Sequence, residues 1–292
     1  MNSSVLDPHP AAAELAATFT TVRSEVLDCI QCNVAVLAER YSGAGSWAQL
    51  GARLGFEPRA LPSGLATVDA PFELQVERSA AAVGLRFAAA RTDQAGLPAL
   101  AAETGPPLYL VADSFDMPWL PYAGHEHMPH SFLLQRQGDR ALVTDAYANE
   151  TAWGAAAPGR WELDWADVPA PAAVYSLQGN QPAAEPQNNG WTDQTIENYL
   201  DRYVECPDRA QAWTALAVET WLLSRSRALH LRWLQSRGAA TEAAVEQVAS
   251  WSEIAGHSFL ASRRVARGRG EPAELIERLA EALRRDRSAF CS

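Results

Sequence analysis

A break in composition at residues 179–190 divides this chain into two parts with different apolar periodicities. Nine of these twelve residues are Gly, Pro, Asn or Gln, which favour turns and loops. Before the break, apolar residues recur with the periods of both strands and helices, whereas after it only the helical period remains. We therefore expect a first domain at residues 1–178, a linker at residues 179–190 and a second domain at residues 191–292.

The second domain is predicted to be a bundle of four or five helices. Its apolar residues recur at spacings of three to five residues throughout. Thr241 suits the N-cap of one helix, and Pro207 and Pro272 suit the first turns of two others.

The first domain is predicted to mix helices and strands. Residues 34–41 carry an apolar stripe with the period of a helix, and residues 76–91 predict a second, Ala-rich helix. Residues 107–111 have the continuous apolar character of a buried strand. Residues 131–136 and 141–144 are separated by a four-residue connection that contains Gly, which fits a β-hairpin.

Composition places the chain among folded, soluble proteins. It has 292 residues, of which 48% are hydrophobic and 20% charged, so it can bury a substantial core. No run approaches the roughly 20 apolar residues of a membrane-spanning helix, and the first 30 residues lack the pattern of a secretory signal. Four cysteines are too few for a disulfide framework in a chain this long. We expect a cytoplasmic protein with no membrane partner.

The distribution of charge argues against nucleic acid as a partner. All 24 basic residues are Arg, and the formal net charge is −11. Residues 1–190 hold 10 Arg against 21 Asp and Glu, whereas residues 191–292 hold 14 of each sign. Because a protein that binds a duplex normally presents a clustered basic face to the phosphates, the acidic first part is not expected to bind one.

Residues 28–32 combine a helix start with two thiols. Asp28 and Gln31 have the spacing of a capping box, which places Cys29 and Cys32 in the first turn of the helix that follows. The amide groups and the positive end of the helix dipole favour a thiolate there, which is the nucleophilic form of cysteine. A nucleophile at this position needs a base.

His130 and Asp145 are the candidate base and its orienting group. His130 begins the predicted hairpin and Asp145 ends it, so the two residues are expected side by side on paired strands. A carboxylate in that position holds an imidazole in one tautomer and one orientation. Cys, His and carboxylate then form a nucleophile, a base and an orienter.

Two short motifs carry a resemblance to a known family. Residues 32–38, Cys-Asn-Val-Ala-Val-Leu-Ala, resemble the Cys-Gly-x-Ala-x-Leu-Ala helix start of papain-like enzymes of the C39 peptidase type. Residues 130–134, the hairpin and residues 144–146 resemble the His strand and following Asp of that group. The similarity covers roughly residues 25–170. It implies an α+β fold, with a papain-like cysteine-enzyme domain and an added C-terminal helical domain.

The same resemblance assigns the catalytic roles. It implies that Cys32 is the nucleophile, that His130 is the base and that Asp145 orients it. Cys29, in the same helical turn, is the alternative nucleophile, which chemical labelling would distinguish. Asn33 stands where the family usually has Gly. Val26 stands where many papain-like enzymes have the Gln of the oxyanion hole, so backbone amides at the helix start or Gln31 are the candidates for that role.

The added helices make the chain similar to the butirosin biosynthesis protein H branch. Its members resemble C39 peptidases but transfer an acyl group from a carrier-protein thioester to an amine. The resemblance implies a cysteine-dependent acyltransferase of natural-product biosynthesis that works through an acyl-enzyme. No cofactor is expected besides a phosphopantetheine on a partner acyl carrier protein. Hydrolysis by a peptidase or thioesterase stays open, because water can replace the amine.

The loop after the buried strand is expected to face the substrate. It is rich in Pro and aromatic residues, and Trp119, Tyr122 and His127 are the candidate substrate-binding residues there, together with Gln31. Packing of the aromatic rings beneath a long loop is the alternative.

Three further interpretations compete with the cysteine enzyme. His125, His127 and His130 lie within six residues, which resembles the metal ligands of metallo-β-lactamase-type hydrolases, although Pro129 replaces their Asp. We expect no metal site. Cys29 and Cys32 also have the spacing of a redox pair, which needs a strand directly upstream, where a helix is predicted instead. A non-enzymatic binding module remains if the cysteines are buried.

Arginines in the helical domain form two candidate docking faces. Arg225 and Arg232 share one helix face, and Arg263, Arg264 and Arg267 share another. Because carrier proteins are acidic and bear a phosphate, such faces suit them. Ordinary solvated helix faces are the alternative.

Overall fold

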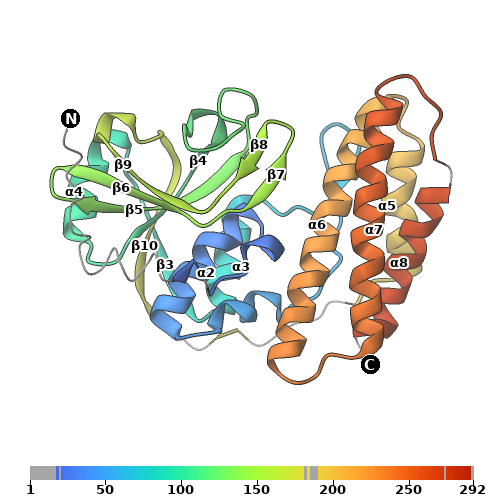
Figure 1. The fold of residues 1–292 in the computed structure, drawn as a ribbon, viewed down its shortest axis with the longest axis horizontal. Helices are drawn as coiled ribbons and strands as arrows, with labels where there is room; N and C mark the ends of the chain where they lie inside the picture. The colour runs from blue at the N-terminus through green and yellow to red at the C-terminus, as the bar shows by residue number, and fades with distance from the viewer. Residues whose placement is uncertain (1–17, 20, 181–182, 185–189, 273, 291–292) are drawn as a thin grey trace. The chain divides into compact units, whose positions relative to one another are not determined.

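The computed structural model describes residues 18–19, 21–180, 183–184, 190–272 and 274–290. The described residues fall into two compact units (Figure 1). The first unit holds the residues before Leu50 together with those from Phe72 to Ala184, and it contains both helices and a sheet. The second unit holds Leu50–Pro71 and the C-terminal helices. The chain is therefore a mixed α/β protein with a helical C-terminal region.

The segment Leu50–Pro71 corrects the expected domain boundaries. Its position in the chain predicts the first domain, but its apolar side chains Leu54, Phe56 and Leu65 are buried in the core of the helical unit. The expected linker also changes at its start, because residues 179–180 end a strand. Residues 181–182 and 185–189 of that linker lie outside the described residues.

The first unit is built on a six-stranded antiparallel sheet with the strand order β3-β10-β4-β5-β6-β9. The strands are β3 (Leu85–Ala90), β4 (Leu108–Asp113), β5 (Pro129–Gln137), β6 (Arg140–Asp145), β9 (Gly159–Leu163) and β10 (Pro171–Asn180). The predicted buried strand is confirmed as β4, in which Leu108–Ala112 are all buried.

The predicted hairpin is confirmed as β5 and β6, with a shorter connection than expected. Gln137 and Arg140 pair with each other, so Gly138 and Asp139 alone make the turn. Gly138 has φ +61°, a conformation that a two-residue hairpin turn requires and that glycine adopts without strain.

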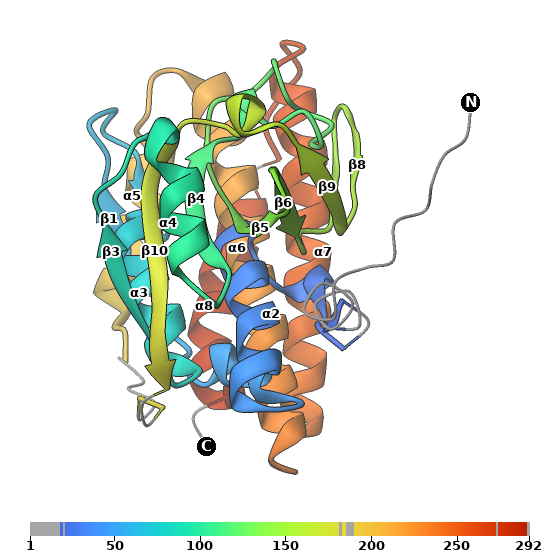
Figure 2. The ribbon, with the colours of Figure 1, turned by 90° about the vertical axis from the view of Figure 1, so that its left-hand side faces the viewer.

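Helix α2 (Cys29–Ser42) confirms the predicted helix and its capping box. The Asp28 carboxylate accepts the amides of Ile30 and Gln31 at 2.9 and 2.7 Å, and the Gln31 side chain accepts the Asp28 amide at 3.2 Å. The helix ends at Gly43, which has φ +101°. Helix α2 and helix α3 (Phe72–Ala82) pack against each other and against the sheet (Figures 1 and 2).

The predicted helix at residues 76–91 is wrong in its second half. Helix α3 covers Phe72–Ala82, and Gly84 with φ +71° turns the chain into strand β3. The alanines at residues 88–90 favour a helix intrinsically, but their pairing with β10 overrides that preference.

Short elements complete the first unit. They are the 3-10 turns η1 (Ser24–Val26), η3 (Gln94–Gly96), η4 (Ser114–Asp116) and η5 (Trp165–Asp167), helix α4 (Leu97–Glu103), and strands β7 (Asn149–Thr151) and β8 (Gly154–Ala156). The 3-10 turn η2 (Ser46–Gly51) begins in the first unit and ends in the second. Strands β7 and β8 form a separate small hairpin.

The second unit confirms the predicted helical bundle with four helices among its described residues. They are α5 (Asp193–Val204), α6 (Arg209–Ser236), α7 (Glu242–Val265) and α8 (Glu274–Phe290), and the short strands β1 (Arg59–Ala60) and β2 (Ala66–Thr67) pair beside them. Thr241 caps α7 as expected. In the part of the chain that is described, no helix combines the length and apolar character needed to cross a membrane.

Candidate active site

His130 lies at the start of β5, completely buried between a carboxylate and a phenol. Its Nε2 lies 2.8 Å from Oδ2 of Asp145, and its Nδ1 lies 3.3 Å from the hydroxyl oxygen of Tyr122. The sequence analysis expected His130 and Asp145 to be adjacent, and the structure brings them into contact through the β5–β6 hairpin.

Asp145 is a buried carboxylate that accepts four hydrogen bonds. Besides His130, the donors are the Trp119 indole at 3.1 Å, the Tyr147 amide at 3.0 Å and the Asn33 side-chain amide at 3.3 Å. Burial alone raises the pKa of Asp145, but the attraction and hydrogen bond of His130, with the Tyr147 and Trp119 donors, outweigh it and hold the pKa below 3.8. Asp145 is therefore ionised at neutral pH.

The network assigns the protons of His130. Because the ionised Asp145 can only accept, Nε2 of His130 carries a proton, and in the neutral ring Nδ1 is an acceptor. The Tyr122 hydroxyl donates to Nδ1. Burial, followed by the neighbouring Tyr147, Cys29 and Asp145, raises the pKa of Tyr122 above its ordinary value, so this phenol stays protonated. Nδ1 is therefore the basic atom of the site.

Cys32 does not occupy the position expected of a nucleophile. Its side chain is fully buried, and its sulfur lies 4.0 and 3.8 Å from the carbonyl oxygens of Ser24 and Leu27, in the segment before the helix. Because a reactive thiol is normally accessible to its substrate, the burial of Cys32 does not favour it as the nucleophile in this structure.

Cys29 is the thiol whose sulfur contacts β5, the strand that carries His130. It is the first residue of α2 and is partly exposed. Its sulfur lies 3.6 Å from the carbonyl oxygen of Pro129, the residue directly before His130. It is also one of the charges that raise the pKa of Tyr122, whose hydroxyl contacts Nδ1. Cys29, His130 and Asp145 thus form the candidate triad, with the thiol at a helix N-terminus.

Asn33 and Ser131 fix the first turn of α2 to the hairpin. The Asn33 amide nitrogen donates to the carbonyl and hydroxyl oxygens of Ser131 at 2.8 and 3.0 Å, and its oxygen accepts the Ala146 amide at 3.1 Å. The Ser131 hydroxyl donates to the Cys29 carbonyl at 2.6 Å. Sequence reasoning noted Asn33 only as a departure from Gly. Asn33 lies four residues after Cys29 and therefore on the same helix face. This spacing was the available sign that Asn33 lies near the candidate site.

The expected substrate-binding residues have different roles from those assigned. Trp119, which is half-buried, donates to Asp145, and Tyr122, which is buried, contacts His130, so both residues support the His130–Asp145 pair. Gln31 completes the capping box of α2. His127 is exposed as expected, and its Nδ1 lies 2.7 Å from Oδ2 of Asp113.

The three clustered histidines do not converge on a common point. His130 faces Asp145, His127 contacts Asp113, and His125 stacks on Trp153 with 5.4 Å between ring centroids. Among the residues that the structure describes, no group of three His, Cys, Asp or Glu side chains is placed to hold a metal ion. The arrangement gives no support to the metal-dependent hydrolase.

The arrangement of Cys29 and Cys32 does not favour a redox pair. Their sulfurs contact the backbone of different segments, Pro129 for one and Ser24 with Leu27 for the other. The described residues directly before α2 form the 3-10 turn η1 instead of the strand that a redox motif requires.

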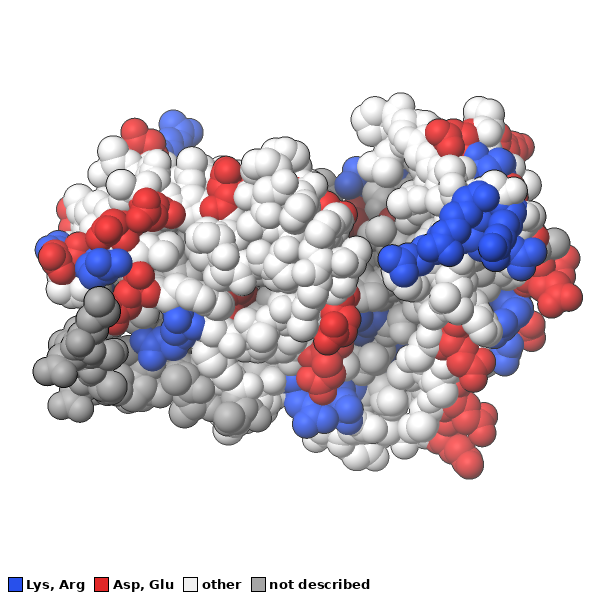
Figure 3. All heavy atoms as spheres, turned by 45° about the horizontal axis from the view of Figure 1, so that its top comes forward, with Lys and Arg blue, Asp and Glu red and all other residues white. Residues whose placement is uncertain are grey.

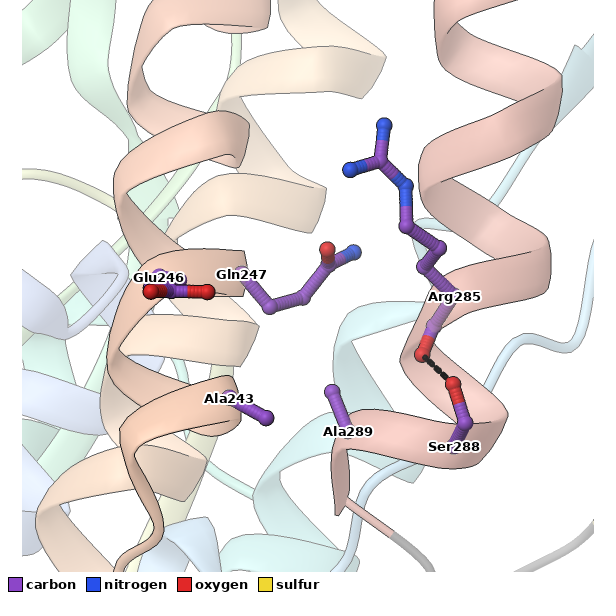
Figure 4. A pocket seen from close by; sticks show the side chains of 6 residues that line it. All are labelled: Ala243, Glu246, Gln247, Arg285, Ser288 and Ala289. Atoms are coloured by element: carbon purple, nitrogen blue, oxygen red, sulfur yellow. Dashed lines mark hydrogen bonds between the residues drawn. The ribbon is translucent and has the colours of Figure 1, made fainter.

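A pocket of about 310 Å³ lies between α7 and α8 of the helical unit (Figure 4). It is lined by Ala243, Glu246, Gln247, Arg285, Ser288 and Ala289. Gln247 is committed to the interior, where it donates to Ala282 and Asp286, and the Ser288 hydroxyl donates to the Arg285 carbonyl. The lining carries no thiol or imidazole, so the pocket does not compete with the Cys29 site.

No protein-family model matches this chain, and no curated protein matches it either. The function therefore has to be inferred from the geometry of the site.

Proposed function

We propose that this protein is a papain-like, cysteine-dependent acyltransferase that moves an acyl group from a thioester to an amine through an acyl-enzyme on Cys29. The observation that carries the proposal is the partly exposed Cys29 at the start of α2, beside Pro129 and the buried His130–Asp145 pair. The motif resemblance assigned the nucleophile to Cys32. The geometry supports the thiol three residues earlier.

The reaction begins with transfer of the Cys29 proton to Nδ1 of His130, and Asp145 stabilises the imidazolium that forms. The sulfur then bonds to the acyl carbon, and the carbon–sulfur bond of the donor breaks. The imidazolium returns its proton to the departing thiolate. In the second half, the amine attacks the acyl-enzyme, Nδ1 accepts the amine proton, and Cys29 leaves and regains a proton.

Tyr122 is the proposed donor to the oxyanion. The amides of Ile30 and Gln31 in the first turn of α2 already bind Asp28, which removes two of the expected candidates. The Tyr122 hydroxyl lies at the reacting nitrogen and stays protonated because burial raises its pKa. When Nδ1 takes the proton of Cys29, this hydroxyl is released to donate to the developing negative charge.

A carrier-protein thioester is the proposed donor, and exposed arginines in the helical unit support it. Arg263, Arg264 and Arg267 are exposed at the C-terminal end of α7, and basic side chains gather on this unit in Figure 3. Such a surface complements an acidic carrier with a phosphate-bearing arm. Hydrolysis to a free acid is the second candidate, since the same triad activates water.

The proposal is tested by acylating the protein with N-acetylcysteamine thioesters and locating the adduct by mass spectrometry. We expect one acyl group on Cys29, none in Cys29→Ala, and an undiminished adduct in the matched variant Cys32→Ala. Adding a primary amine should release an amide, whereas release of the acid alone identifies a thioesterase or peptidase. An adduct on Cys32, or on neither cysteine, contradicts the proposed nucleophile.

A further inference from the structure

The exposed apolar side chains of the first unit gather around its candidate active site. Among the described residues of this unit, the large hydrophobic side chains that are at least 36% exposed are Phe115, Met128 and Trp153, at 36, 37 and 42%. Phe115 and Met128 belong to the loop between β4 and β5, which also carries Tyr122, and Trp153 lies at the turn between β7 and β8. We call these three residues the apolar rim.

The apolar rim is held in place by ring stacking. Phe115 stacks on His127 with ring centroids 4.2 Å apart and planes 6° apart, and His127 contacts Asp113. Trp153 stacks on His125 in the same way, at 5.4 Å and 12°. A preformed apolar surface binds an apolar ligand without first losing side-chain entropy on ordering.

Backbone hydrogen bonds order the loop that carries Phe115 and Met128. The Ser114 amide donates to the Met128 carbonyl and the Gly124 amide donates to the Phe115 carbonyl, each at 2.9 Å. The two rim residues of this loop therefore have fixed backbones.

One residue of the apolar rim adjoins a residue that contacts the proposed nucleophile. Met128 directly precedes Pro129, whose carbonyl oxygen contacts the sulfur of Cys29 at 3.6 Å. A group attached to that sulfur therefore starts one residue away from Met128. Exposed apolar surface at such a place marks a ligand-binding surface more often than chance exposure does.

The charges of the segments around the apolar rim favour some classes of acyl group over others. Residues 92–135 and 141–159 contain no Lys or Arg, whereas they include the acidic residues Asp113, Asp116 and Glu126 near the rim. An acyl group with a carboxylate or phosphate finds no Lys or Arg in these segments, which favours an uncharged apolar group.

We infer that the apolar rim binds the uncharged aromatic or aliphatic part of the acyl group that is transferred to Cys29. This inference rests on the proposed function, and it adds the class of acyl donor: benzoyl-like or medium-chain groups in preference to acetyl or succinyl.

The inference can be tested with alkylating reagents, which need no acyltransferase activity. The rates at which iodoacetamide and N-benzyl-iodoacetamide label Cys29 are measured by mass spectrometry, and their ratio reports the apolar contact. We expect the benzyl reagent to react faster at low concentration. In Phe115→Ala and Trp153→Ala, this preference should fall by about fivefold, while the rate with iodoacetamide stays unchanged. The control Leu260→Ala, which removes an exposed apolar side chain of the helical unit, should leave the ratio unaltered.

Thioesters then test the acyl group itself. Benzoyl and octanoyl thioesters of N-acetylcysteamine should acylate Cys29 faster than acetyl or succinyl thioesters, and the rim variants should remove most of that difference. Equal labelling by both reagents, a preference for succinyl, or rim variants that keep the wild-type ratio would overturn the inference. If Cys29 is acylated at the same rate by all four thioesters, the proposed function is supported and the binding role of the apolar rim is contradicted. If no reagent labels Cys29, both fail.

Discussion

At the scale of single residues, the protonation of the site depends on the hydrogen bonds that the buried Asp145 carboxylate accepts. Its four donors replace the water that a buried carboxylate loses, and they leave the charge directed at His130. An amide at this position offers one acceptor oxygen and adds two hydrogens, so it cannot serve the same four donors.

Asp145→Asn should therefore slow acylation of Cys29 by a factor on the order of 10³ to 10⁴, because His130 loses both its tautomer and the charge that stabilises the imidazolium. The acylation rate is measured by mass spectrometry with an N-acetylcysteamine thioester, and near-ultraviolet circular dichroism checks that the fold is kept. Asp139→Asn, in the exposed hairpin turn, is the matched control. A loss smaller than tenfold in a folded Asp145→Asn protein would contradict this role.

The two cysteines show how far sequence reasoning reaches at this scale. The capping box correctly placed Cys29 and Cys32 in the first turn of one helix. Which sulfur contacts β5 depends on the rotation of that helix about its axis, and that rotation is set by contacts such as the one from Asn33 to Ser131. Those partners lie 98 residues apart. A local pattern carries no information about them.

At the scale of elements, prediction succeeded where local signals agreed with long-range pairing. Strands β4, β5 and β6 combine apolar runs with a glycine turn, and each was found. Strand β3 was missed, because its alanines favour a helix and its partner β10 is more than eighty residues away. A buried carboxylate in α6, Glu219, also has hydrogen-bond partners far away along the chain.

Glu219 connects α6 to the segment around β2. Its carboxylate accepts hydrogen bonds from the Thr67 hydroxyl at 2.6 Å, the Val68 amide at 2.7 Å and the Tyr199 hydroxyl at 3.2 Å. Burial raises the pKa of Glu219 to about 7, although these three donors act in the opposite direction, and the nearby Asp69 adds to the increase. Folding therefore favours the protonated form of Glu219 relative to the unfolded chain.

The pKa of Glu219 predicts how stability changes with pH. A carboxyl whose pKa rises from 4.5 to about 7 on folding binds its proton more tightly in the native state. Its contribution is most favourable below pH 4.5 and is lost as the pH rises to about 7, by about 3 kcal/mol. Glu219→Gln should remove this component, so unfolding free energies at pH 5 and pH 8 should differ less than in the wild type.

Urea denaturation at the two pH values, followed by circular dichroism, measures this difference. Glu246→Gln, at an exposed position of α7, is the control and should retain the wild-type dependence. If Glu219→Gln keeps the full pH dependence, the raised pKa of Glu219 is not its cause.

At the scale of the whole molecule, each of the two units is built from two separate stretches of the chain. The compositional break correctly separates the sheet from the C-terminal helices, but it cannot reveal that Leu50–Pro71 leaves the first unit and joins the second. That segment has no helical period of its own. Its place is decided by burial of Phe56 beside Tyr199 and Trp191, with ring centroids 5.2 and 6.1 Å away.

This arrangement predicts that a mutation near the N-terminus destabilises the C-terminal helices. Phe56→Ala removes a buried ring from the core of the helical unit and should lower its unfolding free energy by about 3–5 kcal/mol. Hydrogen exchange measured by mass spectrometry locates the effect: amides of α5 and α8 should lose protection, and those of β4 to β6 should keep theirs. The control is Phe259→Ala, which deletes an exposed phenyl ring of α7. It should change neither the unfolding free energy nor the protection of these amides. Loss of protection confined to the sheet would mean that residues 50–71 stabilise the first unit, as their position in the chain had suggested.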